Sequence, residues 1–131
     1  MLTDNQFHNA GLTYYKRHYH DPGQHALTGK PEDMGKFRTP TLRNVANTGP
    51  WMHNGLFPRL DGVLRLYNAG MPRTKRKPDQ IDDPLFPETS HLLKPLKLDP
   101  QQLADLEAFL RALDERPVRM LRQPFPALLA E

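Results

Sequence analysis

The clearest periodic pattern of apolar positions lies near the end of the chain, over Asp99–Arg116. Leucine and phenylalanine recur there at intervals of three and four residues, which is the spacing of one face of a helix. Asp99 is a good N-cap, Pro100 suits the first helical position, and Gln102 completes a capping-box pattern. Pro117 ends the predicted helix. Its apolar stripe, which needs a packing partner, consists of Leu103, Leu106, Phe109, Leu110 and Leu113.

Weaker patterns precede this helix. Apolar positions over Leu60–Ala69 predict a second helix, and Gly70 is a suitable residue to end it. A short third helix is predicted over Thr41–Ala46. The segment Met71–Leu98 contains five prolines and little periodicity, so we predict an ordered loop there. No segment indicates a strand, and the tail 117–131 is predicted to be extended or loosely docked.

Composition favours short helices. Fourteen prolines and 8 glycines in 131 residues disfavour both a sheet and a long helical bundle. The predicted fold class is therefore all-α, with short helices on long, proline-rich loops. No window reaches the roughly 18 apolar residues that a membrane span needs, and the N-terminus does not resemble a signal peptide. The absence of cysteine excludes disulfides and thiolate zinc sites, and it excludes haem attachment within this chain, which requires C-x-x-C-H.

The net charge of +3 includes a basic run at residues 73–77. Such a run could contact phosphates, but no aromatic residues are interleaved with it, so we interpret it as a solvated loop and expect no nucleic-acid partner. The alternative is a basic docking face. Three histidines, His18, His20 and His25, lie close together beside Asp21. They could bind zinc or copper, although their spacing matches no established zinc motif and favours a polar surface loop.

The stretch Gly35–Gly70 contains the best candidate site. Glycines flank a loop in which Trp51 and Met52 could line an apolar slot. Arg38 and Arg43 would suit anionic groups at the edge of that slot. Taken separately, each feature also has an ordinary structural explanation.

Longer motifs make the stretch specific. Residues 36–55, KFRTPTLRNVANTGPWMHNG, precede L-x-x-V-L-R-L-Y-N-A-G at 60–70. Together they resemble the C-terminal haem domain of bacterial di-haem cytochrome c peroxidases, with the methylamine-utilisation enzymes as nearer relatives. The opening LTDNQFHNAGL is similar to the segment after the second C-x-x-C-H motif, and the helix near residue 100 is similar to the terminal cytochrome c helix. The resemblance covers roughly residues 2–115.

The resemblance implies an axial ligand to haem iron. Tyr67 lies fourteen positions after His53, where the family carries an axial methionine or tyrosine. His53 and Gly55 match an aromatic-x-H-x-G signature beside the second haem. A phenolate is a hard anionic donor, whereas a thioether is soft and neutral. A tyrosine ligand would therefore stabilise ferric iron more than a methionine ligand does, and it would lower the reduction potential of the haem. Met71 and Met52 are the rival ligands.

Other positions receive roles through the same resemblance. Arg38 and Arg43 match arginines near the haem propionates, and Trp51 and Met52 belong to the cofactor-binding set. His8 matches a histidine of unspecified role. The backbone carbonyls of two residues are implied in holding a structural calcium ion, namely Thr48 and Pro50.

The implied cofactor is haem c, although its attachment motif is absent from this chain. The chain begins just after the position of that motif in the family, so we interpret it as a fragment, a split gene product or a degenerate paralogue. We expect a partial cytochrome c-like domain over residues 1–116 and a tail over 117–131. Without the attachment helix, the stripe of the last helix and an unfilled haem cleft should be exposed.

The implied activity belongs to an intact periplasmic enzyme. Hydrogen peroxide would react at the other haem, and an electron donor protein would supply electrons through this one. The partner would be the missing N-terminal haem portion or another cytochrome, and the isolated chain is expected to be inactive. The alternatives are a haem-free interaction module that docks on a partner cytochrome and a histidine-rich metal binder.

Overall fold

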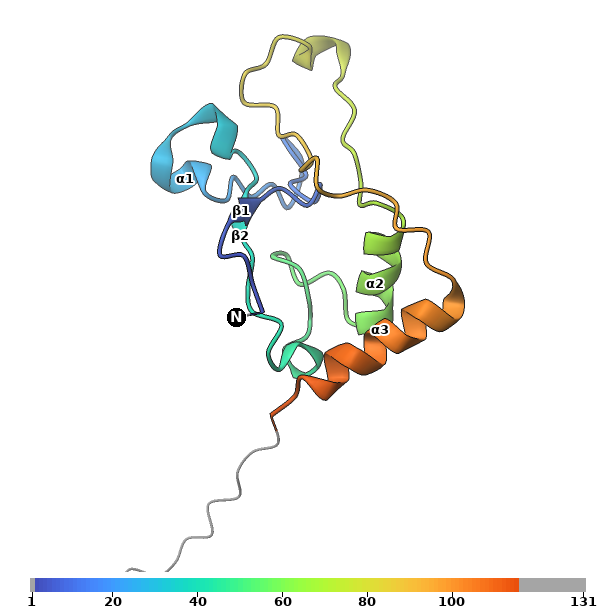
Figure 1. Cartoon of the computed structure of the whole chain (residues 1–131). Helices are drawn as coiled ribbons and strands as arrows, with labels where there is room; N and C mark the ends of the chain where they lie inside the picture. The colour runs from blue at the N-terminus through green and yellow to red at the C-terminus, as the bar shows by residue number, and fades with distance from the viewer. Residues whose placement is uncertain (1, 116–131) are drawn as a thin grey trace, which may run out of the picture.

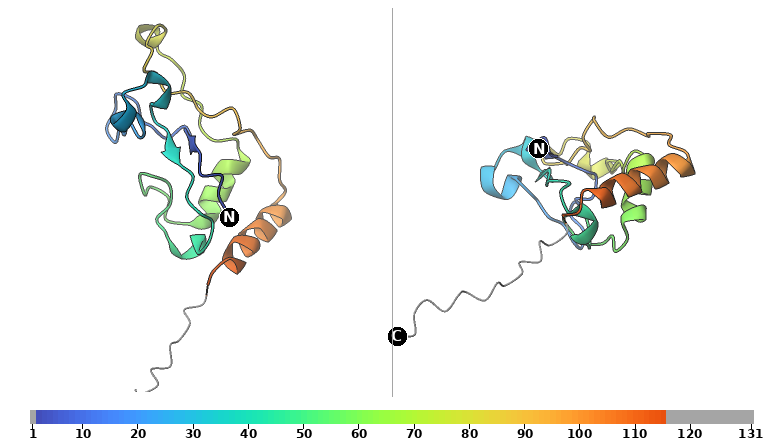
Figure 2. Two further views of the ribbon diagram at one scale, coloured as in Figure 1. Left: turned by 60° about the vertical axis from the view of Figure 1, so that its left-hand side comes forward. Right: turned by 60° about the horizontal axis from the view of Figure 1, so that its bottom comes forward.

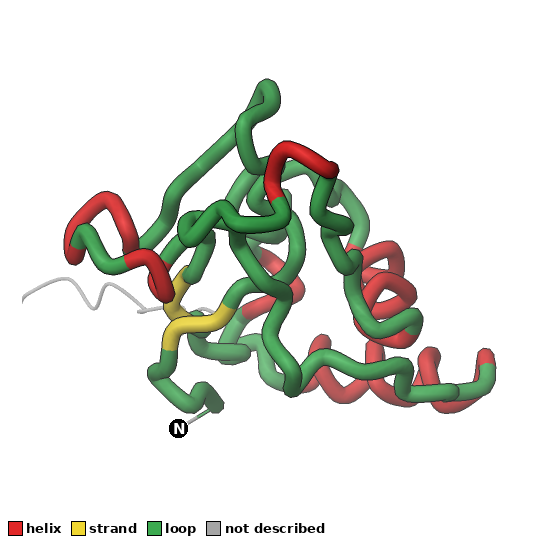
Figure 3. Tube along the Cα trace, turned by 90° about the horizontal axis from the view of Figure 1, so that it is seen from above, coloured by secondary structure: helices red, strands yellow, loops and turns green. Residues whose placement is uncertain are grey.

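The computed structural model describes residues 2–115 of the chain, and most of the trace is loop (Figure 1, Figure 3). The predicted tail over 117–131 lies outside the described residues. No helix among those described is long and apolar enough to cross a membrane. In order along the chain, the elements are β1 (Phe7–His8), α1 (His25–Thr28), the 3-10 turn η1 (Pro31–Asp33), β2 (Phe37–Arg38), the 3-10 turn η2 (Val45–Asn47), α2 (Leu60–Asn68), the 3-10 turn η3 (Pro78–Gln80) and α3 (Pro100–Ala112).

The helix α3 begins as its sequence predicts. The Asp99 carboxylate accepts from the backbone N–H of Gln102 at 2.9 Å, and the Gln102 side chain accepts from the N–H of Asp99 at 3.0 Å. The helix ends at Ala112, before the predicted end at residue 116. At this end the Leu113 N–H donates to the carbonyl of Leu110 at 3.3 Å, and the Leu113 carbonyl accepts from the backbone N–H of Asn44 at 3.3 Å. The capping box is confirmed and the predicted end is wrong.

The helix α2 lies within one residue of its predicted bounds. Gly70 follows it with a φ of +91°, and a Cβ there would lie 2.7 Å from the Pro95 backbone nitrogen, so glycine is required. The helix predicted over Thr41–Ala46 is wrong in extent. Asn44 adopts a left-handed conformation with a φ of 61°, and only the short turn η2 follows it.

The all-α prediction is wrong because the structure contains a two-stranded antiparallel sheet. Strands β1 and β2 pair with Phe7 opposite Arg38 and His8 opposite Phe37. Each strand is two residues long, which is too short for an alternating pattern to appear in the sequence. The helix α1 was not predicted either, because its four residues are too few to show a helical spacing of apolar positions.

The main core lies between α2 and α3, which lie side by side in Figures 1 and 2. Leu60, Leu64 and Leu110 are buried there. Three half-buried leucines of the α3 stripe pack around them, namely Leu103, Leu106 and Leu113. Three residues from the segment before α2 do so as well, namely Val45, Ala46 and Trp51. Phe109 is the exception, because half of its surface is exposed. The expectation of an exposed stripe is therefore wrong except at Phe109, since α2 and η2 cover the other members.

A second cluster orders the proline-rich loop that follows α2. Tyr15 packs against Phe86, and its hydroxyl donates to the Asp83 carboxylate at 2.9 Å. Lys16 donates to the same carboxylate at 2.8 Å. The hydrogen bonds from Lys16, the Leu85 backbone and Tyr15 lower the pKa of Asp83 to about 2. The predicted ordered loop is confirmed, with η3 as a short turn inside it.

Two arginines of the basic run are used within this loop. The guanidinium of Arg76 donates to the carbonyls of Gln80, Ile81 and Asp83 at 3.0–3.1 Å and lies over the Phe86 ring. Arg73 donates to the carbonyl of Leu93. These side chains stabilise the loop, so the run is not simply solvated as predicted.

Candidate functional site

The candidate axial ligand lies on the inner side of α2. Leu60, Val63, Leu64 and Tyr67 are spaced three, four and seven residues apart, so they share one side of the helix. The first three are buried, whereas Tyr67 is 38% exposed. Partial burial of the Tyr67 phenol raises its pKa, because burial disfavours the charged phenolate. The side chain is thus partly enclosed, and its hydroxyl has no hydrogen-bond partner among the described residues.

The loop between η2 and α2 is anchored by Trp51. Its indole nitrogen donates to the carbonyl of Val45 at 2.8 Å, and its backbone N–H donates to the carbonyl of Phe57 at 2.9 Å. The ring packs against the core between α2 and α3. A Cβ at Gly49 would lie 2.9 Å from this ring, so the loop passes close to it. Trp51 therefore has a structural role, and it joins the loop to the helix that carries Tyr67.

His53 is held in the same loop with an unpaired nitrogen. Its ring stacks on Phe37 of β2, with centroids 3.9 Å apart and planes 9° apart. Its Nε2 is buried and has no hydrogen-bond partner among the described residues. Burial lowers the pKa of His53, which favours the neutral imidazole. The loop thus presents a neutral ring in a fixed orientation.

The neighbouring Asn54 repeats this pattern. Its Oδ1 accepts from the backbone N–H of Leu56 at 3.2 Å, while its Nδ2 is buried without a partner within residues 2–115. An unsatisfied buried polar atom costs about 1–3 kcal/mol, so native proteins contain few of them. Both atoms, like Oδ1 of Asp114, therefore need a hydrogen-bond partner from outside residues 2–115, and a water molecule can serve as one.

The two candidate arginines are each paired within the chain. Arg38 donates to the Asn5 side chain at 2.5 Å, and Arg43 forms an exposed ion pair with Glu115. The Arg43 pair fastens the segment before η2 to the end of α3. No hydrogen bond joins either arginine to Tyr67 within residues 2–115. His8 lies on β1, where its Nε2 is 2.7 Å from the Asp4 carboxylate.

The structure adds no support for a metal-ion site. Thr48 and Pro50 are exposed, and the Thr48 hydroxyl donates to the carbonyl of Val45 at 3.1 Å. Across residues 2–115, no group of three or more histidine or acidic side chains could hold a metal ion. Calcium binding through the two carbonyls stays a prediction.

The three histidines that are close in the sequence each contact a different neighbour. His18 packs edge-on against Tyr19, and His20 packs against Tyr15. The Nδ1 of His25 is 2.7 Å from the carbonyl of Lys30. The segment that carries them turns rather than running extended, because Tyr14, Lys16 and Tyr19 all have positive φ. The surface-loop interpretation accounts for these positions, and the histidine-rich metal binder has no support.

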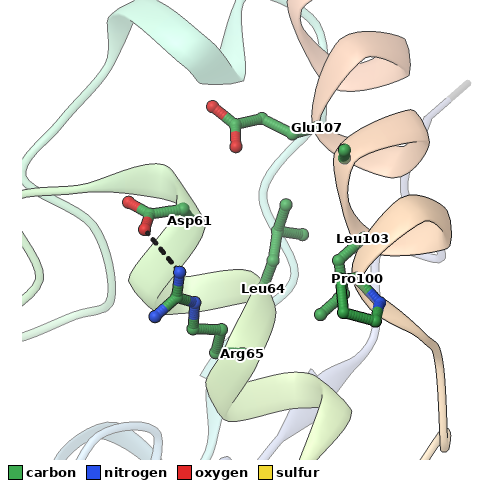
Figure 4. A pocket seen from close by; sticks show the side chains of 7 residues that line it. Asp61, Leu64, Arg65, Pro100, Leu103 and Glu107 are labelled. Atoms are coloured by element: carbon green, nitrogen blue, oxygen red, sulfur yellow. Dashed lines mark ion pairs between the residues drawn. The ribbon is translucent and has the colours of Figure 1, made fainter.

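Two hollows lie elsewhere on the surface. The first, of about 330 Å³, lies between α2 and α3. It is lined by Leu64 and Leu103 and by Asp61 and Arg65, which form an ion pair of 3.6 Å (Figure 4). The second, of about 710 Å³, lies between β1, η1 and residues 84–91. Neither hollow is lined by Tyr67 or by residues of the 48–55 loop, so neither is the expected haem cleft.

Sequence reasoning missed two residues of this loop region. Phe37 and Asn54 both lie inside the motif of residues 36–55, but they carry no role in the resemblance. Nothing in the sequence marks Phe37, because its position depends on the pairing of its strand with His8, which lies far from it along the chain. Asn54 could be suspected only from its place between His53 and Gly55.

The comparisons with known proteins agree on one group of relatives. No protein-family profile matches the chain. Cytochrome-c peroxidase IdrP1 of Denitromonas iodatirespirans is 43% identical over 99 residues, which are 76% of this chain and 23% of that protein. The methylamine utilization protein MauG of Paracoccus denitrificans is 34% identical, over 88% of this chain and 35% of that protein.

A solved structure is similar as well. The crystal structure of a MauG-like protein associated with microbial copper homeostasis matches with a TM-score of 0.67 and 37% identity, over 88% of this chain and 36% of that one. The chain thus spans between about a quarter and a third of the length of these relatives. The sequences and the backbone geometry point to the same proteins. The chain belongs to the family of the di-haem cytochrome c peroxidases and MauG.

Proposed function

We propose that this chain forms the axial-ligand side of a haem-binding, cytochrome c-like unit in a peroxidase-type oxidoreductase. Its relatives are named as cytochrome-c peroxidases and MauG proteins, which supports a haem enzyme of this class. Haem c, when bound, would supply one-electron transfer at its iron. The role of the chain's own residues is to supply a ligand, shape the apolar surroundings and fix the orientation of the group.

The observation that carries this proposal is the position of Tyr67. Its ring lies on the same side of α2 as three buried residues, yet more than a third of it is exposed. Its rival Met71 is buried in the core at 6% exposure, and Met52 lies in the loop with a φ of 65°. Tyr67 is therefore better placed than either methionine to contact a group from outside the chain.

The described residues fit a haem group in a second respect. A haem is flat and apolar with two carboxylates at one edge, so its pocket combines apolar walls with a few polar contacts. The polar atoms left without partners at His53 and Asn54 meet the second need. Arg38 and Arg43 would contact the carboxylates only by exchanging their present partners.

The remaining parts of the proposal concern the intact enzyme. There, a second haem-bearing portion or another cytochrome would complete the site, and an electron donor protein and hydrogen peroxide would be its substrates. A periplasmic location accords with haem c, whose attachment occurs in enzymes of this kind after export. Thr48 and Pro50 would add backbone carbonyls to a calcium site at the boundary with that second portion.

Titration of the 131-residue chain with ferric haem tests the proposal. The Soret band should shift and saturate at one haem per chain, with Tyr67→Phe weakening binding by about tenfold or more, since one iron–ligand bond is lost. Tyr19→Phe is the matched control, because Tyr19 is 61% exposed on a different loop. Equal binding by the native chain and Tyr67→Phe would contradict the assignment of Tyr67.

A further inference from the structure

Exposed leucines and lysines lie next to one another along residues 90–98, the last part of the proline-rich loop. Leu92 and Leu96 are 62% and 51% exposed. Lys94 and Lys97 are exposed as well, and neither lysine side chain forms an ion pair or a hydrogen bond within residues 2–115. A single exposed leucine is ordinary on a protein surface, so it is the combination of apolar and basic side chains that marks this segment.

The backbone of this segment is held against the end of α2. The backbone carbonyl of Asn68, the last residue of α2, accepts from the N–H of Leu96 at 3.0 Å. The Asn68 Oδ1 accepts from the N–H of Leu98 at 2.9 Å, and its Nδ2 donates to the Leu98 carbonyl at 3.1 Å. Lys97 lies between these two residues with a φ of 57°. The exposed side chains are therefore carried by an ordered backbone.

The basic run of the sequence joins this segment in the fold. The guanidinium of Arg73 donates to the carbonyl of Leu93, which lies twenty residues further along the chain. Residues 71–77 and 90–98 together contain six lysines and arginines and no acidic residue. The two segments therefore form one surface with an excess of positive charge.

We call this the lysine–leucine surface. Its six members are all exposed, namely Arg73, Lys75, Leu92, Lys94, Leu96 and Lys97. The carboxylates that flank it along the chain are engaged elsewhere, because Glu88 pairs with Arg76 at 3.2 Å and Asp99 caps α3. The flanking carboxylates thus leave the charge of the surface available to an outside partner.

The kinds of side chain in this surface distinguish between possible partners. Interfaces with another protein, or with a further part of the same one, are depleted in lysine and enriched in aromatic residues. A single-stranded nucleic acid favours aromatic residues on which bases stack, but residues 71–77 and 90–98 contain no Phe, Tyr or Trp. A bilayer with anionic lipids presents negative headgroups above an apolar layer. Lysines that contact the headgroups and leucines that enter the boundary below them fit such a bilayer best.

We propose that the lysine–leucine surface binds bilayers that contain anionic lipids and so holds the protein at a membrane face. The attachment is peripheral, because only side chains of an extended segment enter the headgroup region. The inference goes beyond the proposed function and does not depend on haem. A failed haem titration would therefore leave it untouched.

Cosedimentation of the 131-residue chain with lipid vesicles tests the inference. One set of vesicles is phosphatidylcholine alone, and the other is an equal mixture of phosphatidylcholine and phosphatidylglycerol. We expect the chain to bind the mixed vesicles at least about tenfold more tightly, and this preference should shrink as salt is raised. Residues 116–131 are the same in every variant, so their contribution to binding cancels.

Two double variants separate the basic and apolar parts of the surface. Lys94→Gln with Lys97→Gln should weaken binding to the mixed vesicles about twentyfold, since each basic residue at an anionic surface contributes about fivefold. Leu92→Ser with Leu96→Ser should weaken binding by about tenfold, and this loss should persist at high salt because it comes from apolar burial.

The matched control replaces the same residue types on the other side of the molecule. Leu27 is 89% exposed on α1, and Lys30 is exposed just after that helix. Figures 1 and 2 show α1 on the opposite side from residues 90–98. Leu27→Ser with Lys30→Gln should bind the mixed vesicles as the native chain does. Far-UV circular dichroism and Trp51 fluorescence establish that each variant is folded.

Three outcomes would overturn the inference. The first is equal binding of the native chain to neutral and mixed vesicles, or binding to neither. The second is a loss in the Leu27 and Lys30 control as large as in the two surface variants. The third is binding to soluble polyglutamate as tight as to the mixed vesicles and unchanged by the leucine substitutions, which would indicate an acidic protein as the partner instead.

Discussion

Replacing Leu110 tests how α3 is attached to the rest of the chain. Leu110 is 7% exposed and belongs to a cluster with Leu60 and Leu64. Truncating a buried leucine to alanine costs about 2–5 kcal/mol, depending on how far the site collapses. Half-buried residues surround this cluster and can relax into the space, so we expect about 3 kcal/mol for Leu110→Ala.

Phe109→Ala is the control, because Phe109 precedes Leu110 on the same helix but is 51% exposed. Complete burial of such a side chain is worth up to about 3 kcal/mol, so a half-exposed ring should lose about 1 kcal/mol. Urea denaturation measures both variants. Trp51 is the chain's only tryptophan and packs against the cluster, so its fluorescence reports on this core.

With a urea dependence of about 1–1.5 kcal/mol per molar, the Leu110→Ala midpoint should fall by about 2 M and the Phe109→Ala midpoint by less than 1 M. A Phe109→Ala variant that is destabilised as much as Leu110→Ala would contradict the attachment of α3 through Leu110. It would show that α3 packs through its other side.

Three further predictions follow from local contacts. Asp83→Asn should lower stability at neutral pH, and the difference from the native chain should shrink as pH falls from about 4 toward 2 in pH-dependent urea titrations. The reason is that the carboxyl pKa rises from about 2 to 3.8 on unfolding, so its stabilising effect is present above that range and lost within it. Asp99→Ala should cost about 1 kcal/mol in thermal unfolding, with loss of the capping box of α3. Gly11→Ala should destabilise, because its φ is +80° and its Cβ would lie 2.0 Å from the Pro72 carbonyl oxygen, whereas Gly62→Ala should stabilise by about 0.5–1 kcal/mol, since Gly62 is in α2 with open space around it.

Local signals in the sequence predicted the elements that depend on local interactions. The capping residues of α3 and the apolar spacing of α2 both act within a few residues, so their helices appear close to the predicted places. The same holds for the proline-rich segment, which is an ordered loop. Its order nevertheless comes from Asp83 and Arg76, whose partners no periodicity reveals.

Features that depend on distant contacts were not predictable in this way. The sheet pairs two strands of two residues each, with Phe7 opposite Arg38, and the residue after α3 accepts a hydrogen bond from Asn44, which lies far from it in the sequence. The candidate site shows the same division. Tyr67 was selected only through the family resemblance, and the pairing of Arg43 with Glu115 requires the folded chain.

The proposal that Tyr67 is an iron ligand can be tested by its state in a haem-loaded chain. Resonance Raman spectroscopy of the ferric complex detects the vibrations of an iron-bound phenolate. We expect these bands in the native 131-residue chain and in Tyr19→Phe, and their loss in Tyr67→Phe. A native complex without phenolate bands, or bands that persist in Tyr67→Phe, would contradict the claim that this side of α2 faces haem iron.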